Sequence, residues 1–296
     1  MGQELDSWFQ EPVLQCHFPW VIIFSMSDKE SKEEIHMVEI NRNACTGCGQ
    51  CMSDCIANNL FLREGKAEVS GNCILCGHCV AVCPLNAVSI PEYDMGDVEE
   101  LSQEQAGLDS DRLLKAIKFR RSVRRFKQKP VSSGDLDMLV QAGRYTATAK
   151  NMQDCRFIFV QKELEILKTL IWDGIGRILD SPAPGPAQAY QGFYEAHMAD
   201  SKQDYLFRNA PAVLFIASEA NIDAGLAAQN MELMGVSLGL GFLYNGYLRW
   251  AAEMNPEVLD WLGVGEKKIE ACALLGYPDI TYKRTAPRRA ADVIFR

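Results

Sequence analysis

Eight cysteines stand between positions 45 and 83, in two runs with the same spacing. Each run reads C-x2-C-x2-C-x3-C, and Pro84 follows the last cysteine of the second run. The first run is Cys45, Cys48, Cys51 and Cys55, and the second is Cys73, Cys76, Cys79 and Cys83. Cysteines this close together let a short loop wrap three thiolates around one corner of a metal–sulfur cubane. The spacing therefore predicts iron–sulfur chemistry in this stretch.

The double run resembles the two-cluster bacterial ferredoxins, in which the fourth cysteine of each run binds the other cluster. The resemblance implies two 4Fe–4S clusters. Cys45, Cys48, Cys51 and Cys83 would bind one, and Cys73, Cys76, Cys79 and Cys55 the other. Gly47, Gly49 and Gly77 agree with this, because glycine lets backbone N–H groups turn toward cluster sulfurs. Ile56, where proline would be common, departs from the pattern without removing a ligand.

Zinc and disulfides are the alternative uses of these cysteines. Zinc sites usually have two C-x2-C pairs separated by a longer spacer. Disulfides need an oxidising compartment, and the first residues lack the basic start of a secretory signal. Both considerations favour iron–sulfur clusters and a cytoplasmic location.

Composition indicates a soluble globular protein with one small module and one larger domain. The 296 residues are 48% hydrophobic and 23% charged, which is ordinary for such proteins. A net charge of −9 argues against nucleic acid as a partner. The apolar stretch 13–26 is too short to span a bilayer, so no membrane partner is expected.

The chain divides into four predicted parts. Residues 1–36 are expected to be a disordered extension, with Met26 and Met37 as alternative start codons. Residues 37–92 form the ferredoxin-type module, with short strands at 38–40, 60–62, 67–69 and 87–90. Residues 93–108 are an acidic linker that contains Gly96 and Gly107. Residues 109–296 form the second domain.

Helices and strands alternate in the second domain, which predicts an α/β or α+β fold. A first helix starts at Asp109 or Ser110 and has an apolar face that includes Leu114 and Ile117. A capping box within 132–135 starts the next helix. Further helices are expected at 163–172 and 223–238, strands at 156–160, 211–217 and 269–275, and a lid or irregular insertion at 173–207.

Two basic clusters lie far apart in this acidic sequence. One spans residues 120–125, and the other comprises Lys283, Arg284, Arg288 and Arg289. Arginine binds phosphate with two parallel hydrogen bonds, so the clusters favour an anionic ligand. Solvated surface charge is the alternative for either cluster alone.

Four motifs in order resemble the FMN-dependent nitroreductase family. They are Arg120-Arg121-Ser122-x-Arg124-x-Phe126 after a helix, the loop 144–153 ending in Asn151-x-Gln153, the segment 223–241, and Leu275-Gly276-Tyr277-Pro278 before a basic tail. The resemblance covers about residues 110–296. It implies an α+β FMN sandwich domain after the small two-cluster module, and a homodimer with the flavin between subunits.

The resemblance also implies roles for individual residues. Arg120, Arg121 and Ser122 would hold the flavin phosphate and ribityl chain together with Arg288 and Arg289. Arg124 would lie toward the pyrimidine edge, where positive charge stabilises reduced flavin. Asn151 and Gln153 would contact the isoalloxazine and ribityl groups, and the backbone at Asn245-Gly246 would face N5. No catalytic side chain is assigned.

Two features qualify the resemblance. Asp154-Cys155 stands where many relatives have Pro-Trp, and an acid near the flavin would lower its electron affinity. Gly239-Leu-Gly241 lacks the third glycine and the acid of a dinucleotide fingerprint, so it does not indicate NAD.

The predicted function is that of an oxidoreductase. A low-potential donor such as ferredoxin or flavodoxin would supply electrons through the two clusters to FMN, which would reduce a nitroaromatic, a quinone or a similar organic acceptor. One alternative is an FMN reductase that takes hydride from NAD(P)H and has accessory clusters. The other is a non-catalytic electron-transfer or redox-sensing protein.

Overall fold

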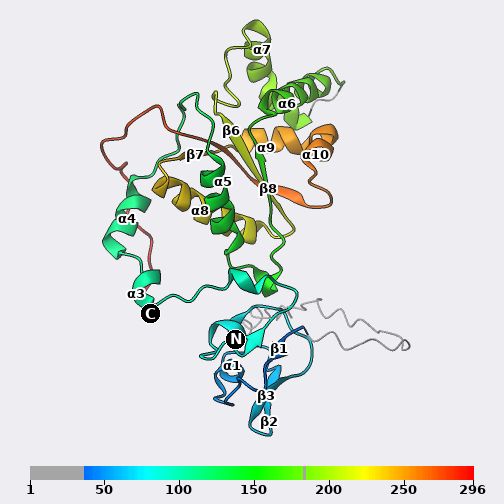
Figure 1. Ribbon diagram of the computed structural model, residues 1–296. Helices are drawn as coiled ribbons and strands as arrows, with labels where there is room; N and C mark the ends of the chain where they lie inside the picture. Colours follow the sequence, from blue (N-terminus) through cyan, green and yellow to red (C-terminus); the bar gives the residue numbers. More distant parts are fainter. Residues whose placement is uncertain (1–36, 183–184) are drawn as a thin grey trace, which may run out of the picture. The chain divides into compact units, whose positions relative to one another are not determined.

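The computed structural model describes residues 37–182 and 185–296 (Figure 1). The expectations for residues 1–36 lie outside the described residues. Among the described residues, no helix is both long and apolar enough to cross a membrane.

The ferredoxin-type module contains two small antiparallel sheets and two one-turn helices. β1 (Glu39–Ile40) pairs with β4 (Val88–Ser89), and β2 (Leu60–Arg63) pairs with β3 (Lys66–Val69). α1 (Gln50–Ser53) and α2 (His78–Ala81) each begin at the third residue of a C-x2-C loop. These strands lie where the apolar segments predicted them, and their buried residues, such as Val38 and Ile90, form one small core with the cysteines.

The two halves of the module repeat the same local structure. Gly49 and Gly77 precede the two helices with φ of +79° and +74°, a conformation that glycine adopts without steric cost. Cys51 and Cys79 lie on the helices and are buried. His78 Nδ1 lies 2.9 Å from Asp54 Oδ2, so an exposed polar contact joins the two helices.

Two short helical turns occupy the predicted linker. They are η1 (Met95–Asp97) and α3 (Gln103–Ala106). Ser102 and Gln105 form a capping box at the start of α3, in which each side chain bonds the backbone of the other. The linker is therefore more structured than its composition predicted.

A four-stranded antiparallel sheet in the order β5-β6-β8-β7 forms the centre of the larger part. The strands are β5 (Arg156–Val160), β6 (Ala212–Ser218), β7 (Gly241–Tyr244) and β8 (Lys268–Gly276). β6 is fully buried, and its alternate residues enter two separate hydrophobic cores. Its continuous apolar run therefore reflects a strand covered on both faces.

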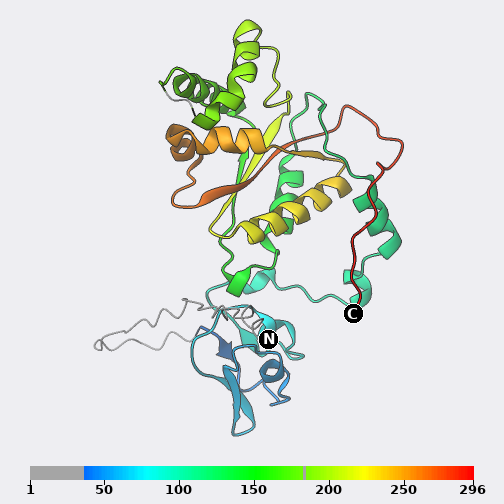
Figure 2. The same ribbon diagram turned by 180° about the vertical axis from the view of Figure 1, so that it is seen from behind.

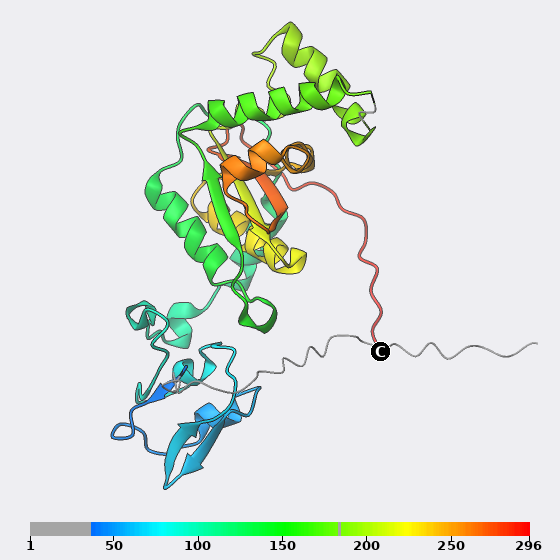
Figure 3. The ribbon, with the colours of Figure 1, turned by 90° about the vertical axis from the view of Figure 1, so that its right-hand side faces the viewer.

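Helices cover the two faces of the sheet. α5 (Ser133–Arg144) and α8 (Asn221–Ser237) lie side by side in Figures 1 and 2 and pack into the core that contains Leu214 and Ile216. α6 (Leu164–Leu179), α9 (Gly246–Glu253) and α10 (Pro256–Leu262) pack into the core that contains Val213 and Phe215. α7 (Gln191–Ala199) lies beside α6 (Figures 1 and 3), after η3 (Gly185–Tyr190).

The predicted insertion at 173–207 is largely helical. α6 continues through Gly174 and Gly176 to Leu179. The two glycines lack a Cβ, and Asn255 and Tyr194 pack against the helix at these positions. The glycines therefore mark close packing and do not end the helix. β7, α9 and α10 were not predicted from the sequence.

The predicted apolar face of the first helix is exposed. α4 (Ser110–Phe119) begins after the cap Asp109, as expected, but none of its residues is buried. Leu114, Ile117 and Phe119 are 52%, 44% and 43% exposed. These three side chains of the predicted apolar face are therefore largely uncovered within one chain.

Only half of the predicted capping box is present at the start of α5. Ser132 Oγ accepts a bond from Asp135 N. The Asp135 carboxylate instead accepts a bond from Tyr277 Oη at 2.6 Å. This pair joins α5 to the end of β8.

Candidate functional site

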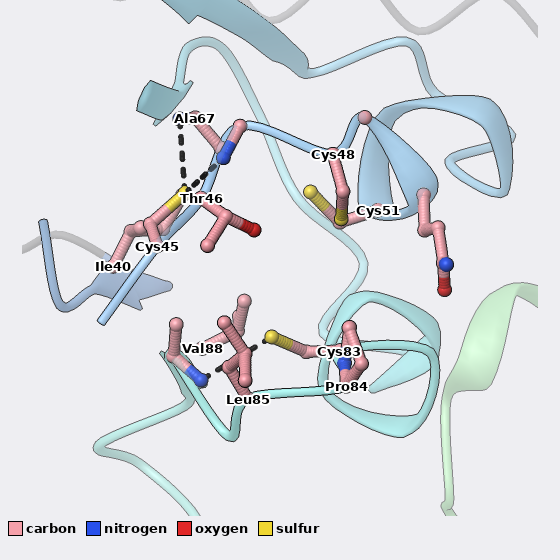
Figure 4. Close-up of a pocket in the computed structure, with 14 residues that line it drawn as sticks. Ile40, Cys45, Thr46, Cys48, Cys51, Ala67, Cys83, Pro84, Leu85 and Val88 are labelled. Carbon is pink, nitrogen blue, oxygen red and sulfur yellow. Dashed lines mark hydrogen bonds between the residues drawn. The ribbon is translucent and has the colours of Figure 1, made fainter. Parts of the chain in front are cut away.

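Each half of the ferredoxin-type module encloses a cavity lined by four cysteines. Figure 4 shows the first cavity, where Cys45, Cys48 and Cys51 of the first run meet Cys83 of the second. The second cavity is lined by Cys73, Cys76 and Cys79 together with Cys55. Each contains about 380 Å³ of space between atoms. The fourth cysteine of each run thus lies at the cavity of the other run.

Backbone N–H groups donate to the cysteine sulfurs in both halves. Cys45 Sγ accepts from Gly47 N and Ala67 N, both at 3.4 Å. Cys73 Sγ accepts from Leu75 N at 3.3 Å. Cys55 and Cys83 each accept from the backbone four residues later. Such bonds stabilise negative charge on sulfur and are a main determinant of cluster potential.

The buried cysteines fit a metal-bound cluster better than free thiols. Burial raises the pKa of the Cys51 thiol, and it raises that of Cys79 to about 11. The N–H of Ala67 is the largest cause that lowers the pKa of Cys45. Because clusters bind thiolates, the positive charge of iron would offset the cost of burying them. The donor set and the cavities therefore suit 4Fe–4S clusters.

Residues 120–126, called the arginine segment below, begin where α4 ends. Ser122 and Val123 of this segment lie beside β7. Ser122 forms a parallel bridge with Phe242, and Val123 N donates to Phe242 O at 2.8 Å. Tyr282 Oη donates to Ser122 O at 3.4 Å. A Cβ on Gly241 would lie 2.4 Å from Val123 Cγ2, so glycine is needed for this close approach.

Arg121 has an unused buried donor. Its Nη1 donates to Arg120 O at 2.6 Å and to Lys118 O at 3.3 Å, the carbonyls that α4 leaves free at its end. Its Nη2 is buried and has no hydrogen-bond partner among the described residues. A buried unpaired donor costs about 1–3 kcal/mol, so this nitrogen suits an acceptor from a ligand such as a phosphate.

Arg120 is paired with a buried acid that the sequence analysis did not single out. Its Nη1 lies 2.9 Å from Glu232 Oε1 on α8, and Glu232 is only 2% exposed. Glu232 Oε2 is buried and has no partner. Glu232 is flanked by Met231 and Leu233 in α8, and this apolar setting was the available sequence signal, because acids are rarely buried without a cation.

The Glu232→Gln variant is expected to be at least as stable as the wild type at neutral pH. Burial, opposed in part by Arg120, raises the pKa of Glu232. When folding raises the pKa of an acid, the protein is most stable at pH values below the pKa that the acid has in the unfolded chain. Stability then falls as pH rises through the pKa that the acid has in the folded protein. Glutamine mimics the protonated acid and removes this loss. Urea unfolding between pH 4 and 8 measures the unfolding free energies of the variant and the wild type. A variant that is clearly less stable than wild type at pH 7 contradicts this prediction.

The tail arginines are not bonded to this segment among the described residues of one chain. Arg124, Arg288 and Arg289 are exposed. Arg288 Nη1 donates only to the adjacent Pro287 O, in a tail that contains no helix or strand from Thr281 onward. Among the described residues, no hydrogen bond or ion pair joins the tail arginines to Arg120, Arg121 or Ser122.

Asn151 and Gln153 contact the ferredoxin-type module and linker. Asn151 Nδ2 donates to Ile74 O and Leu75 O at 3.0 and 2.9 Å. Gln153 Nε2 lies 3.0 Å from Tyr93 Oη. The loop that carries them is held by the buried Asp223, whose Oδ2 accepts from Ala149 N at 3.1 Å. The structure therefore gives these two side chains partners other than the arginine segment.

Asn245 and Gly246 begin α9 directly after β7. Asn245 Oδ1 caps the helix by accepting from Leu248 N at 2.9 Å, and its Nδ2 donates to Leu206 O. Gly246 is exposed, and a Cβ there would meet nothing within 4 Å. β7 thus connects this turn to Phe242, which lies beside Ser122.

Asp154 forms a local network at the end of β6. Its carboxylate accepts bonds from Ser218 Oγ at 2.9 Å and from Glu219 N, and lies 3.4 Å from Lys267 Nζ. The backbone bond from Glu219 is the largest of the causes that lower its pKa, against the opposing effect of burial. Asp154 therefore joins β5 to β6, a structural role that the expectation of an acid near the flavin had not included.

Asp97 is an acid of the linker that contacts the second domain. Asp97 pairs with Arg144 and accepts from Tyr145 Oη at 3.0 Å. The bond from Arg144 is the largest cause of its lowered pKa, followed by that from Tyr145. Because the pKa of Asp97 is lowered, its contact with Arg144 is fully formed at pH values above the ordinary aspartate pKa near 3.8. The contact is lost as pH falls through the lowered pKa of the folded protein.

The Asp97→Asn variant is expected to release this attachment at neutral pH. Asparagine cannot form the charged pair with Arg144, so the segment around η1 should exchange its amide hydrogens faster. The wild-type protein should show the same increase in amide exchange around η1 only below about pH 4. Asp137→Asn, an exposed change on α5, is the matched control. Equal exchange in both variants at pH 7 contradicts the assignment.

The chain belongs to the nitroreductase family. The family model described as "Nitroreductase family" matches residues 117–277, more than half of the chain. A second model, described as "4Fe-4S dicluster domain", matches residues 37–84. The chain is thus a member of this family with a ferredoxin-type dicluster domain.

Among its curated relatives are the proteins named "NADPH-dependent oxidoreductase" of Staphylococcus aureus strain bovine RF122 / ET3-1 and of Staphylococcus epidermidis strain RP62A. They are 27% and 28% identical over 159 and 156 residues, which cover 51% of this chain and 59% of each relative. The chain therefore spans about three fifths of the length of the curated relatives it matches.

A solved structure has the same fold as the larger part. It is a nitroreductase with bound FMN from Bacteroides fragilis, with a TM-score of 0.52 and 24% identity, and the match covers 64% of this chain and 100% of that one. These findings confirm the predicted family and fold class. The dicluster model agrees with the predicted pair of 4Fe–4S clusters, and the FMN named for the solved structure belongs to that protein. The electron path, the acceptor and the site residues stay predictions.

Proposed function

We propose that this chain is an iron–sulfur flavoprotein that takes electrons from a low-potential donor such as ferredoxin or flavodoxin. It passes them through its two cluster sites and an FMN site to a nitroaromatic, a quinone or a similar organic acceptor. When bound, FMN accepts single electrons and delivers a pair, which such acceptors require. The observation that carries the proposal is the presence of two four-cysteine cavities in a chain of the nitroreductase family.

The arginine segment supports the FMN site. Arg121 offers a buried donor without a partner, and Arg120 is oriented by Glu232. Ser122 is fixed beside β7 by its bridge to Phe242. In this proposal Arg120, Arg121 and Ser122 hold the phosphate and ribityl chain, and Arg124 lies toward the pyrimidine edge. The turn at Asn245-Gly246, three residues along β7 from Phe242, lies about 10 Å further along the same strand and faces the reactive end of the ring.

Exposed apolar side chains support a homodimer. The uncovered face of α4 is accompanied by Ile222 and Leu226 on α8, at 71% and 48% exposed, and by Trp250 on α9, at 53%. Exposed apolar side chains that gather in one patch usually mark a protein interface, and in the proposal the α4 face belongs to the contact between two copies. In the proposal the tail that carries Arg288 and Arg289 reaches a second copy of the chain, where these arginines complete the phosphate site.

The test is made on anaerobically purified protein. Iron, sulfide and FMN are counted per chain, and reduction of a nitroaromatic is followed with dithionite-reduced ferredoxin as donor. The proposal predicts FMN in a stoichiometric amount, iron and sulfide for two 4Fe–4S clusters, and turnover. Protein that binds no FMN, or that reduces no acceptor with this donor, contradicts it.

A second candidate is an enzyme that uses NADPH as its donor. The names of the curated relatives favour it. It predicts that NADPH alone bleaches the flavin absorbance in an anaerobic stopped-flow experiment, before any change in the cluster absorbance. Bleaching with reduced ferredoxin but not with NADPH supports the first candidate instead.

A further inference from the structure

The two halves of the ferredoxin-type module differ in their contact with the larger part of the chain. In the second half, Asn151 Nδ2 donates to the consecutive carbonyl oxygens of Ile74 and Leu75. These residues lie between the ligand candidates Cys73 and Cys76. In the first half, the matching carbonyls of Thr46 and Gly47 accept no side-chain hydrogen bond from any described residue. The cysteine loop of the second half is thus the one bonded to the loop before β5.

This contact continues directly to a cysteine sulfur. The carbonyl of Ile74 and the N–H of Leu75 belong to the same peptide group. The carbonyl accepts from Asn151 at 3.0 Å, and the N–H donates to Cys73 Sγ at 3.3 Å. Hydrogen bonds in such a chain polarise one another, so the Asn151 amide strengthens the bond onto Cys73.

Leu75 needs this support because of its backbone conformation. It has φ of +52° where the first half has Gly47 at +71°. Leucine has a side chain that disfavours this region by about 1–2 kcal/mol. Asn151 bonds the carbonyls of Ile74 and of Leu75 itself, and so holds the loop in the turn that directs the Leu75 N–H to sulfur.

The loop that carries Asn151 is itself firmly built. Lys150, Asn151 and Gln153 all have positive φ. Their turn is held by the bond from Ala149 N to the buried Asp223 and by the bond from Gln153 N to Thr148 Oγ1 at 3.0 Å. Strained residues held in this way usually serve a position that function requires.

We propose that Asn151 is a positioning residue that fixes the second cysteine loop against the larger domain. It follows that the cluster site of Cys55, Cys73, Cys76 and Cys79 is the one that exchanges electrons with that domain. The inference rests on the proposed function. Each transfer between the cluster site and the larger domain moves a single electron, which the low-potential donor named above supplies. No bond is formed or broken in this transfer.

The inference predicts a change in one cluster potential. Hydrogen bonds to the sulfurs favour the reduced, more negative cluster. Without the Asn151 amide, the Leu75 N–H bond to Cys73 is weaker and the loop is less well held. Asn151→Ala should therefore move the reduction potential of the second-half cluster to a more negative value and leave that of the first-half cluster unchanged.

The experiment is a redox titration of the anaerobic holoprotein followed by electron paramagnetic resonance. The variants are Asn151→Ala and Asn151→Asp, whose carboxylate keeps the size but cannot donate. Asn221→Ala, an exposed change at the start of α8, is the matched control. A Cys76→Ser protein identifies the second-half signal, because its altered ligand changes that signal alone.

The expected result is a negative shift of the second-half signal in both Asn151 variants, with the first-half signal as in wild type. Unchanged potentials of both clusters would overturn the inference. So would unchanged cluster potentials with a loss of FMN affinity, because Asn151 would then act at the flavin. The proposed function fails separately, if wild-type protein binds no FMN, whether or not the cluster potential shifts.

Discussion

Gly47→Ala is expected to yield protein that has lost the first cluster and keeps the second. An added Cβ would lie 2.1 Å from the backbone oxygen of Gly65, at the turn between β2 and β3. Neither backbone can move away as a flexible side chain would. The loop that carries Cys45 and Cys48 must therefore shift, and the N–H bond from residue 47 to Cys45 Sγ is lost with it.

Gly49→Ala is the matched control for this change. Gly49 has a similar φ of +79°, but a Cβ there would meet nothing within 4 Å. It carries only the conformational cost of about 1–2 kcal/mol. We expect iron and sulfide to fall by about half in Gly47→Ala and to stay near the wild-type value in Gly49→Ala. Full iron content in Gly47→Ala would show that the loop does not need this close approach.

Arg121→Ala is expected to weaken FMN binding by about 10- to 100-fold. A charge-assisted hydrogen bond contributes about 1.5–3 kcal/mol, and each 1.4 kcal/mol is a factor of ten in affinity. The unfolding free energy of the FMN-free protein should change by less than about 1 kcal/mol, because the change also removes a buried donor that has no partner. Loss of affinity without loss of stability distinguishes a ligand contact from a structural one.

Fluorescence titration with FMN measures the affinity, and urea unfolding of the FMN-free protein measures the stability. Arg125→Ala is the control, because Arg125 is exposed and forms only a surface pair with Asp279 at 3.6 Å. Surface pairs of this kind contribute about 0–1 kcal/mol. If Arg121→Ala binds FMN as tightly as Arg125→Ala, the buried nitrogen of Arg121 is not part of the phosphate site.

The cysteine module could be predicted closely from the sequence because its determinants are local. Spacing alone separates the eight cysteines into two runs, and the structure places Cys55 and Cys83 at the exchanged positions that the ferredoxin resemblance implied. β5, β6 and β8 were also close to their predicted bounds, since buried strands have continuous apolar runs.

Features that depend on distant partners could not be predicted in the same way. The helix was expected to end at residue 172, but α6 continues to Leu179, and Gly174 is the site where Asn255 packs against it. Asn151 matched a flavin motif, and only the fold revealed Ile74 and Leu75 as its hydrogen-bond partners. In each case the partner is many residues away in sequence.

The segment after α4 also protects the sheet. β7 is its last strand, and the bridge between Ser122 and Phe242 occupies backbone groups on the outer side that would otherwise be open. Open strand edges promote aggregation between molecules, because they offer unpaired N–H and C=O groups. A ligand held by Arg121 and Ser122 would keep this segment in place, so protein without its ligand should aggregate more readily on storage.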